Sequence, residues 1–312
     1  MKLFISFALI LSFQSNAQEK SDLVKCLNSL PTPLSIESLK FANDTTKAIS
    51  LSKLIQPQKI IIKSESRVRK DFPAYFYLAK NPKGIVIYVH GGGCRRRLDL
   101  EKMTDIDTLA INKFTFLSGY SVLMLNYATG TNDTIGIENV NKTFSEISNE
   151  ETCKEVTNIH LQGIKDAISE IRKKYSDKLP IYVLGHSYGG YLVNILSTTK
   201  PTISTVNGFI SYAGIWDTGI QDDYGKSYHA SSALNPINDI QNAQSNLLVI
   251  HSQDDTAVSF VQFSRFKDIE PIFRNNKVVR SLELQSGGHF TDDITINKQI
   301  MDSIIKFTDE TK

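Results

Sequence analysis

The strongest chemical signal in the chain is Gly185–Gly189, with the sequence Gly-His-Ser-Tyr-Gly. It follows an apolar run at Ile181–Leu184 that favours a buried strand, and it precedes a stretch that favours a helix. A sharp strand-to-helix turn strains the backbone of its central residue, and only small neighbours permit it. Ser187 is therefore predicted to be a nucleophile at a helix N-terminus, where backbone N–H groups meet developing negative charge. A glycine-rich turn without catalytic function is the alternative.

A second glycine-rich motif, His90–Gly93, directly follows the apolar run Ile85–Val89. Successive glycines let a backbone approach a substrate closely and expose its N–H groups. Acyl transfer creates an oxyanion that needs such donors in place beforehand. Alone, this motif would be interpreted as a flexible turn, but together with the serine motif it predicts an oxyanion-binding loop.

Both motifs occur in a chain whose expected strands and helices alternate. The expected strands are Ile60–Lys63, Asp71–Ala79, Ile85–Val89, Ser121–Leu125, Ile181–Leu184, Gly208–Tyr212, Leu247–Ile250 and Val279–Leu284. The expected helices are Thr108–Leu117, Asn158–Tyr175, Tyr188–Ser197 and Ile294–Phe307. Strand runs that are apolar throughout indicate a largely parallel sheet covered by helices, so the fold class is α/β. In such sheets the active site lies beyond the carboxyl ends of the strands.

The domain organisation inferred from this pattern is a leader over residues 1–17, an N-terminal arm over 18–59 and one catalytic domain over 60–312. Two segments fall outside the alternation, Thr129–Thr157 and Ile215–Ala243. The second is predicted to be a small cap-like insert, at about residues 215–243.

The leader has the features of a secretory signal peptide. Lys2 precedes the apolar run Leu3–Phe13, and small residues follow at Ser15 and Ala17. This run is too short to cross a bilayer, which needs about 20 apolar residues. We expect an exported protein, periplasmic or secreted after cleavage near Ala17, with no stable membrane anchor; an N-terminal core helix is the alternative.

The overall composition is that of an ordinary globular protein of 312 residues. Its 35 basic and 33 acidic side chains give a formal net charge of +2, so there is no electrostatic reason to expect nucleic acid as a partner. No cluster of histidine, cysteine or carboxylate residues has the spacing of metal ligands, so we expect no metal. The sequence contains no phosphate-binding loop, and we expect no cofactor. Export would place Cys26, Cys94 and Cys153 in a disulfide-permissive compartment, and their pairing and the oligomeric state stay open.

On these motifs, the chain from about Asp71 to its C-terminus resembles the α/β-hydrolase superfamily, in the branch of carboxylesterases, lipases and prolyl oligopeptidase-like proteins. The resemblance implies an α/β-hydrolase fold, with a mostly parallel sheet, helices on both faces and a small cap insert. It also implies a catalytic triad in the chain order serine, acid, histidine.

The acid is expected after the strand Leu247–Ile250. The sequence from His251 to Val258 is similar to the family's H-G-x-x-D-x-x-V stretch, which implies Asp255 as the acid and leaves Asp254 as the alternative. Ser252 stands where the family pattern has glycine.

The base is expected to be His289, one of six histidines. It follows the last expected strand and precedes the last expected helix, which is the position that the hydrolase architecture requires. His90 and His186 belong to the glycine motifs, His251 ends a strand, and His160 lies in an amphipathic helix where a structural role is the default.

The implied mechanism is ester hydrolysis through an acyl-enzyme. His289 would take the proton of Ser187, and Asp255 would orient the imidazole and stabilise its charged form. Backbone N–H groups of Tyr188, Gly91 and Gly92 would bind the oxyanion. The expected partner is a small-molecule ester.

Three further residues are candidates for substrate binding. Arg95 could pair with a substrate carboxylate, although a solvated loop arginine is the more common situation. Trp216 and His229 lie in the second insert and could line an acyl pocket, but ordinary packing of a small cap explains such residues equally well.

Two other functions compete with the esterase. A prolyl oligopeptidase-like serine peptidase would use the same catalytic parts, but such peptidases usually carry an N-terminal propeller that the residues before the core cannot build. A non-catalytic binding protein on a hydrolase scaffold is the third possibility, and the complete triad set argues against it.

Overall fold

The structure is a computed structural model that describes residues 57–64, 71–79, 81–92, 119–127, 150–175, 179–199, 203, 205–220, 234–273, 277–291 and 293–312. Several sequence predictions lie outside the described residues: the leader, most of the arm, the helix Thr108–Leu117, and Cys26, Cys94, Arg95 and His229. Cys153 lies within a described helix, but its side chain is not among those described.

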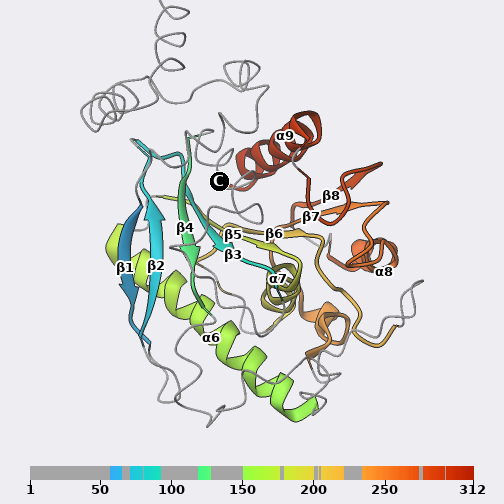
Figure 1. Ribbon diagram of the computed structural model, residues 1–312, viewed down its shortest axis with the longest axis horizontal. Coiled ribbons are helices and arrows are strands. Elements are labelled where there is room, and N and C mark those ends of the chain that lie inside the picture. Colours follow the sequence, from blue (N-terminus) through green and yellow to red (C-terminus); the bar gives the residue numbers. More distant parts are fainter. Residues whose placement is uncertain are drawn as a thin grey trace, which may run out of the picture.

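The described strands form one eight-stranded sheet (Figure 1). They are β1 (Gln58–Ile62), β2 (Phe72–Tyr77), β3 (Ile85–Val89), β4 (Ser121–Leu125), β5 (Ile181–His186), β6 (Gly208–Tyr212), β7 (Leu247–Ser252) and β8 (Val279–Leu284). Their order in the sheet is β1-β2-β4-β3-β5-β6-β7-β8. β2 pairs antiparallel with both β1 and β4, whereas all pairs from β4 to β8 are parallel. Because the last six strands run the same way, their carboxyl ends meet at one edge of the sheet.

The central strands are buried along their whole length because both faces of the sheet are covered. Every residue of β3 is buried, and its side chains alternate between two separate cores. Ile85, Ile87 and Val89 contact one core, and Val86 and Tyr88 contact the other. This double burial is the reason why the strand reads as an unbroken hydrophobic run in the sequence.

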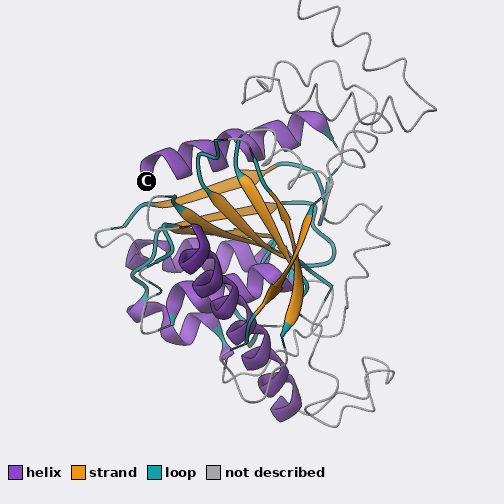
Figure 2. Cartoon of the chain, turned by 90° about the vertical axis from the view of Figure 1, so that its left-hand side faces the viewer, coloured by secondary structure: helices purple, strands orange, loops and turns teal. Residues whose placement is uncertain are grey.

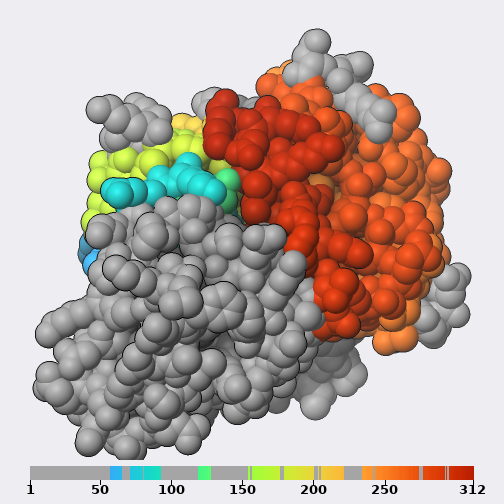
Figure 3. Space-filling model, turned by 90° about the horizontal axis from the view of Figure 1, so that it is seen from above, coloured from blue at the N-terminus to red at the C-terminus, as the bar shows by residue number. Residues whose placement is uncertain are grey.

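Helices cover the two faces unequally (Figure 2). α6 (Glu150–Tyr175), α7 (Tyr188–Thr198) and α8 (Val261–Phe273) pack on one face, and a short 3₁₀ helix, η2 (Pro236–Asn242), packs beside α7 and α8. α9 (Ile294–Glu310) packs on the other face through apolar residues that include Ile300, Ile304 and Phe307. The C-terminal segment, red in Figure 3, also forms part of the outer surface, beside the orange segments. Among the helices of the described part of the chain, none combines the length and the apolar character needed to cross a membrane.

Two helices differ from what the sequence analysis predicted. α6 begins at Glu150, so it takes up the end of the segment Thr129–Thr157 that was predicted to lie outside the alternation. α8 was not predicted at all. Its apolar residues are interrupted by Gln262 and Glu270, which are buried on the packed side of the helix, and Pro271 lies inside its last turn. These three residues obscure the helical period in the sequence.

The described parts of the predicted cap insert pack against the core. Ile215, Ile237 and Ile240 contact the core on the side of α7 and α8, and Tyr191 Oη of α7 donates a hydrogen bond to the carbonyl of Leu234 at 3.1 Å. Residues 221–233, in the middle of the insert, lie outside the described residues.

Candidate active site

Ser187 lies in the turn between β5 and α7, at the carboxyl edge of the sheet. Its backbone angles are φ 57° and ψ −120°, a region that residues with a side chain rarely adopt. The neighbouring glycines explain how the chain tolerates this turn. A Cβ on Gly185 would lie 2.1 Å from the carbonyl oxygen of Gly189, and one on Gly189 would lie 2.0 Å from the carbonyl oxygen of Val89. The strain that the sequence motif predicts at the serine is therefore present in the backbone.

Replacement of Gly189 by alanine is expected to destabilise the protein by about 2–3 kcal/mol or more, since the new methyl group would overlap backbone atoms that cannot move aside. Urea denaturation of the purified protein measures this free energy of unfolding. Gly288→Ala is the matched control: it has φ +60° but no atom within 4 Å of the new Cβ. That control should cost only about 1 kcal/mol, from the backbone conformation alone. Equal losses in the two variants would contradict the close packing of the turn.

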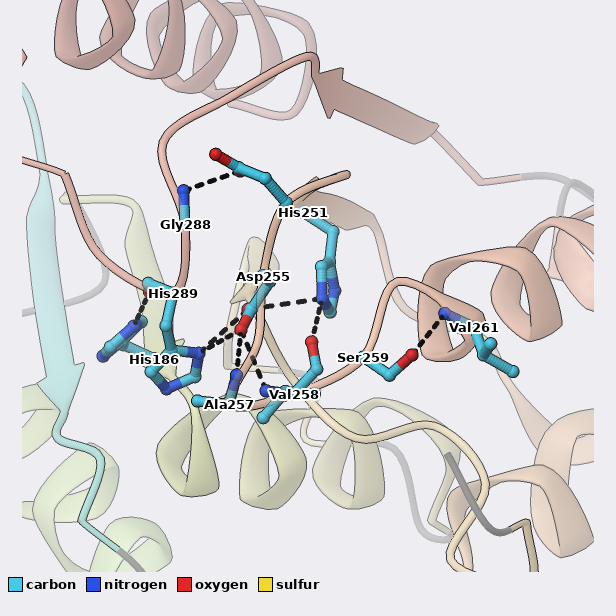
Figure 4. A network of polar contacts seen from close by, with 10 residues as sticks. His186, His251, Asp255, Ala257, Val258, Ser259, Val261, Gly288 and His289 are labelled. Atoms are coloured by element: carbon cyan, nitrogen blue, oxygen red, sulfur yellow. Dashed lines mark hydrogen bonds and ion pairs between the residues drawn. The ribbon is translucent and has the colours of Figure 1, made fainter. Parts of the chain in front are cut away.

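His289 and Asp255 form a hydrogen-bonded pair in the loops that follow β8 and β7 (Figure 4). His289 Nδ1 lies 2.9 Å from Asp255 Oδ2 and 3.1 Å from Oδ1. The Asp255 side chain is fully buried, whereas that of His289 is 25% exposed. An Nδ1–H that donates to the carboxylate leaves Nε2 of the imidazole as a proton acceptor, which is the tautomer that a general base needs.

The Asp255 carboxylate has further partners that hold it in place. The backbone N–H groups of Ala257 and Val258 both donate to Oδ1 at 2.9 Å. His251, which is completely buried, lies on another side, with Nε2 3.4 Å from Oδ2 and 2.8 Å from the carbonyl of Val258. Asp255 therefore lies between two imidazoles, and sequence reasoning missed the second of them.

These contacts decide the charge state of Asp255. Burial by itself would raise the pKa of the carboxyl group, but hydrogen bonds from His251 and His289, the charge of His289 and the Val258 N–H all lower it. The net effect holds the pKa of Asp255 well below its usual range. Asp255 therefore stays ionised although it is buried. An ionised carboxylate is what stabilises an imidazolium beside it.

A pH dependence of stability follows from this lowered pKa. A carboxyl group whose pKa is lower in the folded state stabilises the fold above its unfolded pKa of about 3.9, and this stabilisation is lost as the pH falls below it. We therefore expect the difference in free energy of unfolding between the wild type and Asp255→Asn to stay constant above about pH 5 and to shrink as the pH falls from about 5 to about 2. Urea denaturation across that range measures it, with the exposed Asp302→Asn as the control variant. A difference that is constant with pH would contradict the assignment.

The glycine loop after β3 lies against the serine turn. A Cβ on Gly91 would lie 2.8 Å from Ser187 Cβ, so the backbone of Gly91 passes directly beside the predicted nucleophile. Gly92 follows with φ 104°. Tyr127 fixes the start of this loop, because its ring stacks on His90 at 4.3 Å and its hydroxyl donates to the His90 carbonyl at 2.6 Å. Tyr188 is the first residue of α7, and the N–H groups of the first helical turn point out of the helix end.

His186 connects the serine turn to the histidine loop. Its Nε2 lies 2.8 Å from the carbonyl oxygen of His289, and the two rings are 4.8 Å apart (Figure 4). Among the described residues, no hydrogen bond joins Ser187 to His289, a contact that is often long before substrate binds. The structure thus brings Ser187, Asp255 and His289 to one edge of the sheet, while their catalytic roles remain predictions.

The alternative acid, Asp254, faces a different partner. Its Oδ1 accepts the N–H of Gly288 at 2.7 Å and its Oδ2 accepts the N–H of Gly287 at 3.2 Å. No hydrogen bond between Asp254 and the His289 imidazole occurs in the described part of the structure. Of the two adjacent carboxylates, only Asp255 contacts the imidazole.

The structure does not bring Trp216 to the site, and this corrects the expectation that it lines a substrate pocket. The side chain is completely buried, with its ring 4.9 Å from that of Phe266 and 5.8 Å from that of Phe273. Gln262 Oε1 also accepts the N–H of Trp216 at 2.7 Å, which ties this segment to α8. Trp216 is a core residue because α8, which the sequence did not predict, provides the surface on which it packs. Arg95 and His229 lie outside the described residues.

Within the described ranges, no group of three or more histidine, cysteine, aspartate or glutamate side chains is arranged so that it could hold a metal ion. The site instead combines a strained serine, a buried imidazole–carboxylate pair and a glycine backbone beside the serine. This arrangement has the parts that acyl transfer requires: a nucleophile, an oriented base and backbone N–H donors.

Comparisons with known proteins concern the family and the fold. Residues 160–311, just under half of the chain, match the sequence model of the prolyl oligopeptidase family. A comparison with curated proteins found no match.

Solved structures share the fold at low sequence identity. The acylaminoacyl peptidase of Pyrococcus horikoshii is 18% identical with a TM-score of 0.58, over 85% of this chain and 43% of the peptidase. A puromycin-hydrolyzing peptidase of Mycobacterium tuberculosis is 16% identical with a TM-score of 0.60, over 83% of this chain and 40% of that one. An esterase of Pyrococcus furiosus is 15% identical with a TM-score of 0.56, over 86% of this chain and 96% of the esterase.

The chain thus spans less than half the length of the two peptidases but nearly the whole length of the esterase. These likenesses confirm the predicted fold, an α/β-hydrolase with a mostly parallel sheet. The family match covers the turn with Ser187, Asp255 and His289. The chain thus has the α/β-hydrolase fold, which both peptidases and esterases among these structures share, and just under half of it matches the prolyl oligopeptidase family.

Proposed function

We propose that this protein hydrolyses carboxylic esters through an acyl-enzyme on Ser187. The observation that carries the proposal is the hydrogen bond of 2.9 Å between His289 Nδ1 and the buried Asp255 carboxylate, beside the strained serine turn. An imidazole held in this tautomer has its other nitrogen directed away from the carboxylate, as a base for the serine requires.

The reaction has two steps. His289 Nε2 takes the proton of Ser187 Oγ as Oγ bonds to the ester carbonyl carbon, and the carbonyl oxygen becomes an oxyanion bound by N–H groups of Gly91, Gly92 and Tyr188. The carbon–oxygen bond to the alcohol then breaks, and the leaving alcohol takes the proton from His289. A water molecule repeats the sequence, releasing the acid and restoring Ser187.

The ester is proposed over the amide because the esterase of Pyrococcus furiosus is similar along 96% of its own length. The prolyl oligopeptidase family match supports the second candidate, a serine peptidase with the same catalytic parts. The two candidates differ in the leaving group: an alkoxide leaves an ester far more easily than an amine leaves an amide.

A substrate panel separates the candidates. The full chain is assayed with p-nitrophenyl esters of increasing acyl length and with aminoacyl and acyl-aminoacyl p-nitroanilides, and kcat/KM is compared. The esterase proposal expects turnover of short-chain esters without matching turnover of any anilide. Efficient cleavage of an anilide would favour the peptidase, and failure of a fluorophosphonate probe to label Ser187 would favour a non-catalytic protein.

We also propose that the protein is exported, which rests on the basic start and apolar run of residues 1–17. Mass spectrometry of protein isolated from its native source tests this. An N-terminus just after Ala17 is expected, and an intact Met1 would contradict the proposal.

A further inference from the structure

The loop that carries His289 connects β8 to α9 and contains two successive residues with positive φ, Gly287 at 132° and Gly288 at 60°. Consecutive backbone N–H groups in a turn can form a concave site for an anion. In this protein the anion is a side chain of the chain itself. The carboxylate of Asp254 accepts both N–H groups, at 3.2 Å from Gly287 and 2.7 Å from Gly288.

Adjacent carboxylates therefore contact adjacent parts of one loop. Asp255 binds the imidazole of His289 (Figure 4). Asp254 binds the backbone N–H groups one and two residues before His289. A third contact comes from the serine turn, where His186 Nε2 lies 2.8 Å from the His289 carbonyl oxygen. The loop is thus attached to the β7–α8 turn on one side and to the β5–α7 turn on the other.

Side-chain packing holds one side of this loop, where the His289 and Phe290 rings lie 4.8 and 5.6 Å from the His186 ring. The side of Gly288 is open. No atom lies within 4 Å of the place that a Cβ of Gly288 would occupy, and the His289 side chain is 25% exposed. Polar contacts therefore act together with this packing to fix where the imidazole lies relative to Ser187. In a catalytic site, a displacement of about 1 Å can cost as much as 10²-fold in rate.

From these contacts we infer that Asp254 is a positioning residue, which holds the Gly287–Gly288 backbone so that the His289 imidazole stays correctly placed relative to Ser187 and Asp255. Its hydrogen bonds go to the backbone of Gly287 and Gly288 and not to the imidazole. The inference rests on the proposed function only in that His289 serves Ser187 as its base. Family resemblance does not predict this role, because the position lies at an unspecified x of the H-G-x-x-D-x-x-V pattern.

The test compares Asp254→Ala, Asp254→Asn and the wild type in the full chain. Asp254→Ala is expected to lower kcat for a short-chain ester, and the rate of fluorophosphonate labelling of Ser187, by about 10-fold, with KM changed less than about threefold. Asp254→Asn keeps one acceptor oxygen and should recover part of the loss. The matched control is Asp268→Ala, an exposed aspartate on α8 whose nearest cation lies at 3.7 Å; it should behave as the wild type does.

A spectroscopic measurement separates positioning from loss of fold and does not depend on any substrate. The downfield proton resonance of His289 Nδ1–H reports its hydrogen bond to Asp255. In Asp254→Ala this signal is expected to broaden or disappear in a protein that circular dichroism shows to be folded. If Asp254→Ala does not fold, Asp254→Asn carries both measurements.

The inference would be overturned by wild-type kcat, labelling rate and Nδ1–H resonance in Asp254→Ala. A rise in KM with unchanged kcat would also overturn it, because Asp254 would then contact the substrate. If no ester is turned over but the resonance still depends on Asp254, the proposed substrate class fails and the positioning role stands.

Discussion

Replacement of Ser187 by alanine is expected to lower ester turnover by about 10⁵- to 10⁶-fold and to abolish labelling by a fluorophosphonate. Ser187 Oγ is the atom that forms the acyl bond, so no other group can carry the intermediate. The measurement is kcat with a p-nitrophenyl ester, together with mass spectrometry after exposure to the probe. KM should change little, because the hydroxyl group contributes mainly in the transition state.

The matched control is Ser264→Ala, an exposed serine on α8 that takes no part in the site. It should retain wild-type kcat and labelling. Activity within 10-fold of the wild type in Ser187→Ala would show that catalysis uses another nucleophile. Alanine adds no bulk at the strained position, so the fold of the variant is expected to survive, and its thermal unfolding checks this.

Replacement of Asp255 by asparagine is expected to lower kcat by about 10⁴-fold. Asparagine has nearly the same shape, but it has no charge to stabilise the imidazolium, and its amide can bind the imidazole in the wrong tautomer. The substitution also removes the carboxylate oxygen Oδ2, which lies 3.4 Å from His251 Nε2. Single-turnover kinetics with a p-nitrophenyl ester should show the loss in acylation.

Comparison with Asp254→Asn makes this prediction specific. Only Asp255 contacts the imidazole, so the loss in Asp254→Asn should be smaller by at least about two powers of ten. Equal losses in both variants, or a larger loss in Asp254→Asn, would contradict the assignment of the acid. The two adjacent residues thus distinguish charge stabilisation of the imidazole from positioning of its loop.

The sheet was largely predictable from the sequence. β3 and β4 have the predicted bounds because each is a nearly continuous apolar run, a pattern that buried parallel strands impose. Other elements shifted at their ends: β1 begins at Gln58 rather than Ile60, and β5 runs to His186 rather than Leu184. Element ends depend on hydrogen bonds to neighbouring strands, which a local pattern does not contain.

The helix α8 shows where the local pattern fails. Gln262 is buried and accepts the N–H groups of Trp216 and Asp217, at 2.7 and 2.8 Å. A polar residue on the buried side is favourable only because this distant segment supplies the donors. The same contact moves Trp216 into the core, so one missed helix and one wrong site prediction share a cause.

The candidate site, like the fold, was predictable from the sequence only in part. Ser187, Asp255 and His289 were selected from motifs and chain order, and the structure brings all three to one edge of the sheet. The contacts of Asp255 with His251 and of Asp254 with the histidine loop were not foreseen. His251 and Asp255 lie four residues apart in the motif itself, so a signal was present in the spacing. Nothing in the sequence links Asp254 to Gly288, which lies 34 residues away.

The sequence alone identified the candidate catalytic residues and the strands that present them, because the constraints of a strained strand-to-helix turn and of a doubly buried strand are local. Tertiary structure decided which of two adjacent aspartates binds the imidazole, what holds the histidine loop, and that Trp216 lies in the core. Those outcomes depend on contacts between segments far apart in the chain. Their geometry is set only when the turns after β5, β7 and β8 meet at the edge of the sheet.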